Sequence, residues 1–186
     1  MWTSGEPGAG HTPPLRISGA EVERVSSFKL LGVHITENLS WSLNSSSLVK
    51  KAHQRLHFLR TLKKAKLCRR ILSDFYRCTT ESILTNCLSV WYGNCNAADR
   101  KALQRVLNSA QRTIGCPLPP IHNIYHDRCL NKAKSIVKDN THPNHGLFTL
   151  FPSDKRYRSL RSRTSRHKNS FFPEAVTLLN KPPPPV

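Results

Sequence analysis

The sequence contains few acidic residues: Asp and Glu number 11 against 29 Lys and Arg, and the formal net charge is +18. A chain this basic repels itself unless a polyanion neutralises it, and nucleic acid is the simplest such partner. Its 186 residues are enough for one domain, and a hydrophobic content of 38% predicts a modest core with loosely held ends. The composition therefore favours one basic domain that binds RNA or DNA without sequence preference.

Long apolar runs and targeting signals are also missing. No segment approaches the roughly 18 apolar residues that a membrane-spanning helix needs. The first residues have neither the charged start nor the apolar stretch of a secretory signal. The six cysteines fall mostly within apolar helical patterns, which is typical of reduced thiols. We therefore expect an intracellular protein, nuclear or cytoplasmic, that is not secreted and does not contact a membrane.

The carboxylates are scattered along the chain, and no Tyr-x-Asp-Asp motif or similar pair occurs. Polymerases and nucleases hold their metal ions between clustered carboxylates. The sequence also lacks a His-x-Asp with a distant His for an iron triad, and a Gly-rich turn for a methyl donor. We expect no enzymatic activity, no cofactor and no small-molecule substrate. A general acid–base pair assembled by folding is the less favoured alternative.

Four residues are candidate zinc ligands: Cys116, His122, His126 and Cys129. Thiolate and imidazole are the ligands that structural zinc prefers. The spacing, however, fits no common zinc module, and three prolines stiffen the loop between the first two candidates. We therefore interpret these residues as surface histidines and partly buried cysteines, and we expect no metal site.

The N-terminal part of the chain divides into two segments. Residues 1–14 are rich in Gly and Pro and are predicted to be a disordered leader. Residues 15–36 contain short β-type runs separated by turn residues, which predicts two or three antiparallel strands. Because an isolated hairpin is marginally stable in water, these strands should pack on the helices that follow.

Four helical periods follow, at about 43–70, 68–91, 96–114 and 121–139. The second is the most apolar and should form the centre of the core, with Phe75, Ile83, Leu88 and Trp91 on its buried face. The predicted fold is mainly α: a short β element, about four core helices and a basic extended C-terminal tail. We accordingly divide the chain into a leader at 1–14, a domain of β-hairpin and helices at 15–139, and a basic, Pro-rich tail at 140–186 with a short helix near 173–180.

The first basic cluster lies between Glu37 and Asp74, a stretch that contains nine Lys or Arg and no acid. Such a face suits phosphates, whose neutralisation releases counterions. The residues of this cluster predicted to contact nucleic acid are Lys50, Lys51, Arg55, Lys63, Lys64, Arg69 and Arg70.

The second basic cluster, at 155–168, is rich in Arg and includes Tyr157. Arginine can form paired hydrogen bonds to phosphates, and a tyrosine ring can stack on bases. The alternative is a solvated tail or a nuclear import signal. The predicted binding residues here are Arg156, Arg158, Arg161, Arg163 and Arg166.

Several motifs resemble one polymerase family over about nine tenths of the chain. They include Leu31-Gly32-Val33-x-Ile35 followed by Leu39-Ser40-Trp41, then Lys51-Ala52-x-x-Arg55-Leu56, Trp91-Tyr92-Gly93 and Arg156-Tyr157-Arg158-Ser159. Together they are similar to the C-terminal third of a non-LTR (LINE-type) retrotransposon reverse transcriptase. The resemblance implies a thumb and tail that grip template and primer. The catalytic aspartates of that family precede the matching region, so the resemblance implies no polymerase activity here.

A second resemblance covers residues 22–67, which are similar to the N-terminal domain of AlkB homologue 8. That family comprises dioxygenase and methyltransferase proteins of alkylated-nucleic-acid repair and tRNA modification. The residues that such chemistry needs are not present in this chain, as described above. The resemblance therefore implies an accessory module for repair or tRNA modification, and a relic without selected function is a third alternative.

Overall fold

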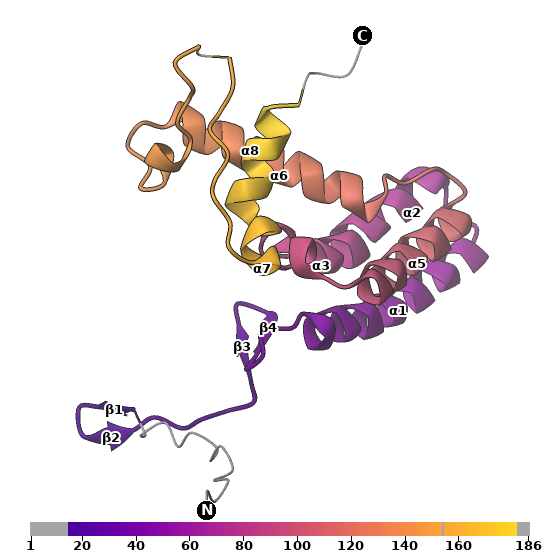
Figure 1. The fold of residues 1–186 in the computed structure, drawn as a ribbon. Helices are drawn as coiled ribbons and strands as arrows, with labels where there is room; N and C mark the ends of the chain where they lie inside the picture. The colour runs from indigo at the N-terminus through magenta and orange to yellow at the C-terminus, as the bar shows by residue number, and fades with distance from the viewer. Residues whose placement is uncertain (1–14, 154, 182–186) are drawn as a thin grey trace, which may run out of the picture.

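The computed structural model describes residues 15–153 and 155–181, and within them the chain is mainly helical, as predicted. Two small hairpins precede a stack of helices, and a C-terminal helical segment returns across the stack (Figure 1). The predicted disordered leader at 1–14 and the terminal prolines lie outside the described residues.

The β element is two separate hairpins instead of one sheet. Strand β1 (Arg16–Ile17) pairs with β2 (Ala20–Glu21), and β3 (Ser27–Leu30) pairs with β4 (Val33–Thr36), both antiparallel. Both two-residue turns have positive φ at their two central residues, which suits the right-handed twist of the strands.

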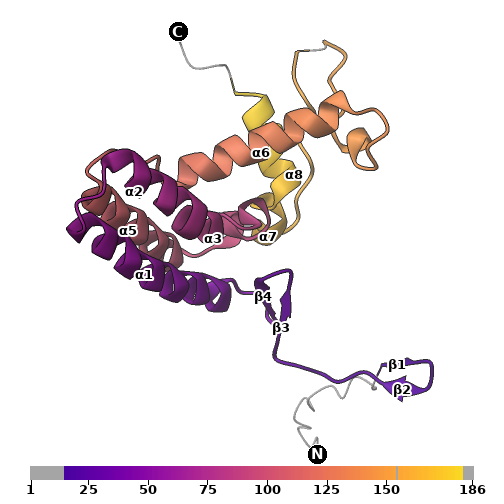
Figure 2. The same ribbon diagram turned by 180° about the vertical axis from the view of Figure 1, so that it is seen from behind.

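Only the second hairpin packs on the helices. Val33 is buried, and the His34 amide donates to Asn44 Oδ1 at 3.2 Å. The β1–β2 hairpin is fully exposed and stands apart from the helices in both ribbon views (Figures 1 and 2). The expectation that all strands pack on the helices is thus wrong for the first hairpin, whose two-residue strands are too short to cover an apolar face.

The first helix, α1, spans Ser42–Lys64 and is shorter than the predicted helix at 43–70. It ends because Lys66 adopts a left-handed backbone with φ +59°, which stops helical hydrogen bonding. The next helix, α2, spans Arg69–Tyr76. Arg69 and Arg70 therefore lie in the first turn of α2 and not at the end of α1.

The predicted continuous helix at 68–91 is broken into shorter pieces. Hydroxyl groups of Thr79, Ser82 and Thr85 each donate to the carbonyl four residues earlier, at 2.6–2.8 Å. Such side-chain bonds compete with the backbone and bend helices. The left-handed Cys87 (φ +48°) completes the break. The pieces that follow α2 are the π-helix η1 (Arg77–Glu81), α3 (Ser82–Leu84), α4 (Leu88–Trp91) and the 3-10 helix η2 (Tyr92–Asn94).

The next two helices confirm the sequence prediction closely. Helix α5 spans Ala97–Ile114; Asn96 caps it by accepting from the Asp99 amide at 2.7 Å, and Gly115 (φ +80°) ends it. Helix α6 spans Ile121–Lys138. The C-terminal part contains η3 (His145–Leu147), α7 (Ser165–Lys168) and α8 (Phe171–Leu179), which starts two residues before the predicted 173.

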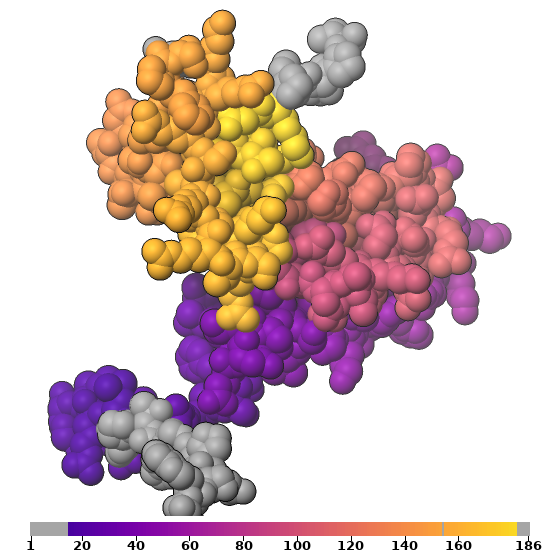
Figure 3. Space-filling view, viewed as in Figure 1, coloured from indigo at the N-terminus to yellow at the C-terminus, as the bar shows by residue number. Residues whose placement is uncertain are grey.

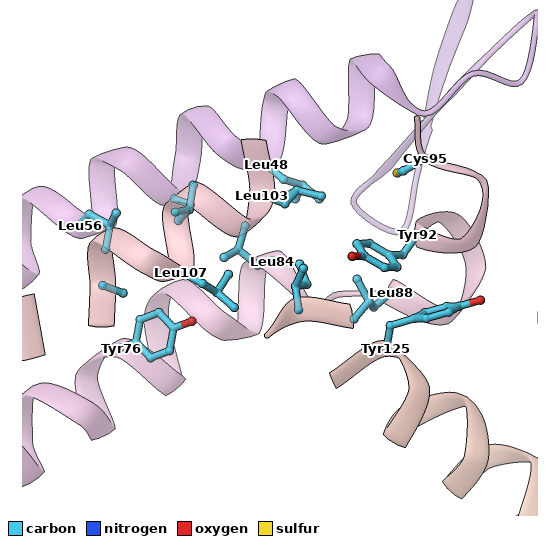
Figure 4. Close-up of a cluster of buried hydrophobic side chains, with 14 of the residues drawn as sticks. Leu48, Leu56, Tyr76, Leu84, Leu88, Tyr92, Cys95, Leu103, Leu107 and Tyr125 are labelled. Carbon is cyan, nitrogen blue, oxygen red and sulfur yellow. The ribbon is translucent and has the colours of Figure 1, made fainter. Parts of the chain in front are cut away.

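The main core lies between α1, the α2–α3 pieces and α5. Figure 4 shows leucines from these helices meeting beside Tyr76. Leu88 and Trp91 are buried as predicted, whereas Phe75 and Ile83 are only partly buried at its edge. A smaller cluster joins α6 to α8 through Ala133, Ile136, Phe148, Ala175 and Val176.

We expect Trp91→Ala to lower the free energy of unfolding by about 3–5 kcal/mol, because it leaves a large cavity in a close-packed core. Trp91 is completely buried, and its Nε1 donates to the Asn86 carbonyl at 2.9 Å. The matched control is Val90→Ala, since Val90 is 59% exposed. Denaturant unfolding measures both variants; a Trp91→Ala midpoint equal to that of the control would contradict this packing.

Candidate nucleic-acid interface

Within the described residues, direct ion pairs do not neutralise the positive charge of the lysines and arginines. All 29 Lys and Arg fall within the described residues, and none of them lies within 4.0 Å of an oxygen of a described carboxylate. The carboxylate with a basic neighbour is Glu174, whose Oε1 lies 3.2 Å from His126 Nε2. Burial lowers the pKa of His126, and His122 acts in the same direction, while Glu174 opposes both. Within the described residues, the lysines and arginines therefore have no carboxylate as a direct partner.

One side of α1 forms a continuous basic stripe. Its buried residues repeat every three to four positions and face the core. A second series with the same spacing is exposed along its whole length and contains no acid. We call this series the α1 stripe; it consists of Lys50, His53, His57, Arg60 and Lys64.

Lys51 and Arg55 lie on a different side of α1 from Lys50. Successive helical residues are separated by about 100° around the axis, so neighbours in sequence do not share a face. Lys51 and Arg55, four residues apart, share their side with the half-exposed Phe58. The cations predicted on the first helix are thus divided between two surfaces.

A second basic stripe runs along α5, and the sequence analysis missed it. Lys101, Arg105, Asn108 and Arg112 recur at spacings of four, three and four and are all exposed. These cations are separated in sequence by uncharged residues, so they do not form a charge run. Helical spacing is the signal that could have found them. We call this series the α5 stripe.

The two stripes meet along the contact between the helices. Helices α1 and α5 run side by side in the same direction (Figures 1 and 2). Arg60 Nη2 donates to Ser109 Oγ at 3.0 Å across the contact. Ser109 has Arg105 and Arg112 as its helical neighbours, one turn before and one turn after it. The stripes therefore form one surface without acids, which we call the α1–α5 surface.

The connection between α1 and α2 carries a further group of cations. Lys63 and Lys64 occupy the last turn of α1, and Arg69 and Arg70 the first turn of α2; all four are exposed. Cations at the start of a helix add to the positive end of its dipole. The free amide groups and the guanidinium groups at this end of α2 therefore both favour an anion.

The second basic cluster is fastened to the helices. The Tyr157 amide donates to Asn180 Oδ1 at 2.8 Å, and Asn180 Nδ2 donates back to the Tyr157 carbonyl at 3.0 Å. The partly buried Tyr157 ring contacts Phe148 edge to face beside the small core, and its stacking on bases stays a prediction. The predicted arginines are all exposed: Arg156, Arg158, Arg161, Arg163 and Arg166.

The four zinc candidates do not converge. Cys129 is buried, and burial raises the pKa of its thiol to about 11, which disfavours the thiolate that binds metals. Cys116 Sγ lies 3.8 Å from Ser73 Oγ. The His122 and His126 rings are 3.9 Å apart, and Glu174 contacts His126. Across the part of the chain that the structure describes, no group of three His, Cys, Asp or Glu could hold a metal ion.

Residues 164–169 hold the C-terminal segment against the start of the helical stack. Arg166 Nη2 donates to the Asn38 carbonyl at 2.9 Å, and Asn94 Nδ2 donates to the Arg166 carbonyl at 3.1 Å. The Asn169 carbonyl packs directly on Gly93, where a Cβ would collide with it and with Tyr125 Oη at 2.7 Å. Figure 3 shows this orange-yellow segment resting on the purple start of α1. Arg166 is thereby brought from the second cluster to the first helix.

The geometry defines a mainly helical basic domain with an exposed surface suited to phosphates. A family model described as "Alkylated DNA repair protein alkB homolog 8, N-terminal" matches residues 41–82, which include α1, α2 and η1. The resemblance to this family is confirmed for that segment, which is shifted toward the C-terminus from the expected 22–67 and covers well under half of the chain. No curated protein and no solved structure matches.

Two further expectations from the sequence concern the polymerase resemblance and membrane-spanning helices. No comparison supports the reverse-transcriptase resemblance, which stays a prediction. For the described residues, no helix combines the length and apolarity required to cross a bilayer.

We expect Gly93→Ala to destabilise the protein by about 1–3 kcal/mol, because a methyl group has no space between η2 and the C-terminal segment. Gly146→Ala is the matched control, since nothing lies within 4 Å of a Cβ there. Thermal unfolding compares the two variants. Equal melting temperatures would show that residues 164–169 do not pack on η2.

Proposed function

We propose that this chain is a non-catalytic module that binds the backbone of RNA or DNA without sequence preference. The observation that carries the proposal is the α1–α5 surface, where two neighbouring helices present cations with no acid between them. A polyanion that lies along both stripes would contact Lys and Arg from each helix at once. Backbone contacts of this kind position nucleic acid but carry no base information.

The absence of ion pairs strengthens this proposal. A surface lysine already paired with a carboxylate must lose that partner before it binds a phosphate. Lys and Arg in the described ranges have no such partners within 4.0 Å. Binding therefore gains the counterion release of each neutralised phosphate without breaking internal salt bridges.

The family match favours one origin for the module over the other. Residues 41–82 match a segment of a protein described as an alkylated DNA repair protein, and this segment contains α1 with its stripe. We therefore infer an accessory module of nucleic-acid repair or tRNA modification as the better supported candidate. The thumb of a reverse transcriptase is the second candidate, supported by sequence motifs alone. Both candidates act on nucleic acid.

The intact chain should neither extend a primed template nor consume 2-oxoglutarate. Metal-dependent polymerisation needs clustered carboxylates, and the described acids lie singly on separate elements: Glu37 before α1, Asp74 on α2, Asp127 on α6. Primer extension and succinate release would each be compared with a heat-inactivated sample. Turnover above that background in either assay would contradict the non-catalytic proposal.

The binding test compares two triple charge reversals of equal charge. Lys64→Glu, Arg105→Glu and Arg112→Glu alter the α1–α5 surface. The control, Lys132→Glu, Lys134→Glu and Lys138→Glu, alters exposed lysines of α6. Affinity for an RNA/DNA duplex would be measured against salt concentration by fluorescence anisotropy.

We expect the surface variant to reduce the log–log salt slope by about one unit per lost phosphate contact, about three in total. The α6 control should keep most of the slope. Reversal of Arg158, Arg161 and Arg163 tests the second cluster in the same assay. If the surface variant and the α6 control lower the slope equally, the net charge and not the α1–α5 surface determines binding.

A further inference from the structure

A groove lies where the C-terminal segment crosses the start of α1. It consists of two adjoining cavities of about 330 and 310 Å³, which share Leu39, Trp41, Asn94 and Arg166 in their walls. Each volume is at the lower end of the range of small-ligand pockets, roughly 300–1,000 Å³. We call this the α1–α7 groove, because α1 and α7 form its two sides.

One wall of the groove is apolar and includes an aromatic ring. Trp41 is half-buried against the main core and lines both cavities. Leu39 is 45% exposed beside it and adopts a left-handed backbone with φ +55°, which is unfavourable for a leucine. The chain thus holds an apolar residue in a strained conformation at the mouth of the groove. A flat apolar ligand would cover this wall.

The rest of the lining presents both hydrogen-bond donors and an acceptor, from the starts of α1 and α5 and from α7. Asp99 Oδ2 accepts from Ser42 Oγ at 2.8 Å, and its second oxygen is not bonded to any other described residue. The Asn169 side-chain amide is not hydrogen-bonded to any described residue either, and Arg166 uses only Nη2, toward Asn38. An isolated phosphate would be repelled by Asp99. A nucleobase, whose edge carries donors and acceptors and whose face is flat, matches both the apolar and the polar part of the lining.

The position of the groove connects it with the α1–α5 surface. Helices α1 and α5 run in the same direction, and the first turns of both, at Ser42 and Asp99, line the groove. A strand that follows the two stripes toward the helix starts therefore arrives at the groove. Arg166 at its rim is available for the adjoining phosphate.

We propose that the α1–α7 groove accepts one unpaired nucleotide of the bound strand, with the base on Trp41 and the base edge toward Asp99 and Asn169. This inference rests on the proposed nucleic-acid binding and adds a preference for strands with unpaired bases. The groove cannot take a base that is stacked within a duplex.

Tryptophan fluorescence of the full chain tests the inference directly. The chain has three tryptophans; Trp2→Phe removes one, and Trp91 is completely buried, so Trp41 is the residue that reports on the groove. A short single strand, a blunt duplex of the same length and a nucleoside monophosphate would be titrated separately. We expect the single strand to quench the Trp41 emission and the duplex to bind without quenching.

Asn169→Ala should weaken single-strand binding about tenfold and leave duplex binding unchanged, because a base contact of this kind contributes on the order of one to a few kcal/mol. Asn131→Ala, an exposed asparagine of α6, is the matched control and should change neither. Trp91 emission reports whether each variant is folded.

Four outcomes would overturn the inference. Salt-dependent binding of the single strand without quenching of Trp41 would contradict base binding in the groove and leave the proposed role of the α1–α5 surface intact. Equal losses of affinity for the single strand and the duplex in Asn169→Ala would also contradict base binding in the groove. A mononucleotide that binds as tightly as the strand identifies a site for a free nucleotide instead. Absence of all binding removes the proposed function and the groove together.

Discussion

The pairing of α1 with α5 is the contact on which most of the structure depends. Leucines and small residues from both helices, such as Ala52 and Ala110, are completely buried between the layers of the core. Ser42 and Asp99 join the starts of the two helices, and Arg60 joins them again near their ends. Because the helices lie side by side on one core, their exposed sides form one surface. A basic surface then follows from spacing alone, without any charged residue in the core.

The C-terminal segment is the second constraint, since it closes the open end of this helix pair. Gly93 allows the Asn169 backbone to approach η2, and Asn180 fixes the run at Tyr157 against α8. Helix α8 in turn packs on α6 through small apolar residues. Residues from three distant parts of the chain, before α1, before α5 and in α7, consequently form one groove.

Much of the helical architecture could be predicted because its signals are local. Asn96 and Gly115 mark the ends of α5 within a few residues, and Pro120 precedes the start of α6. The end of α1 at Lys66 and the break at Cys87 carry no such mark, because residues of ordinary helical preference adopt left-handed conformations there.

The candidate site shows the same division. The run at 155–168 and the acid-free stretch around α1 are visible as charge runs, whereas Arg105 and Arg112 become a surface only when α5 lies beside α1. A sequence shows that the Tyr157 ring is near arginines but not that it also contacts Phe148 edge to face. Asn169 and Asp99 are 70 positions apart, so no local pattern could have placed them in one groove.

The lysines and arginines lack carboxylate partners among the described residues, and this has a consequence for the free protein. Mutual repulsion among exposed cations opposes the compact state. Dissolved ions at 0.1 M largely screen this repulsion between charges more than about 10 Å apart. The same ions compete with the protein for a polyanionic partner. Raising the ionic strength therefore makes the free fold more stable while it dissociates the complex. In dilute salt the partner takes the place of these ions and acts as the counter-charge of the fold, so that folding and binding are thermodynamically linked.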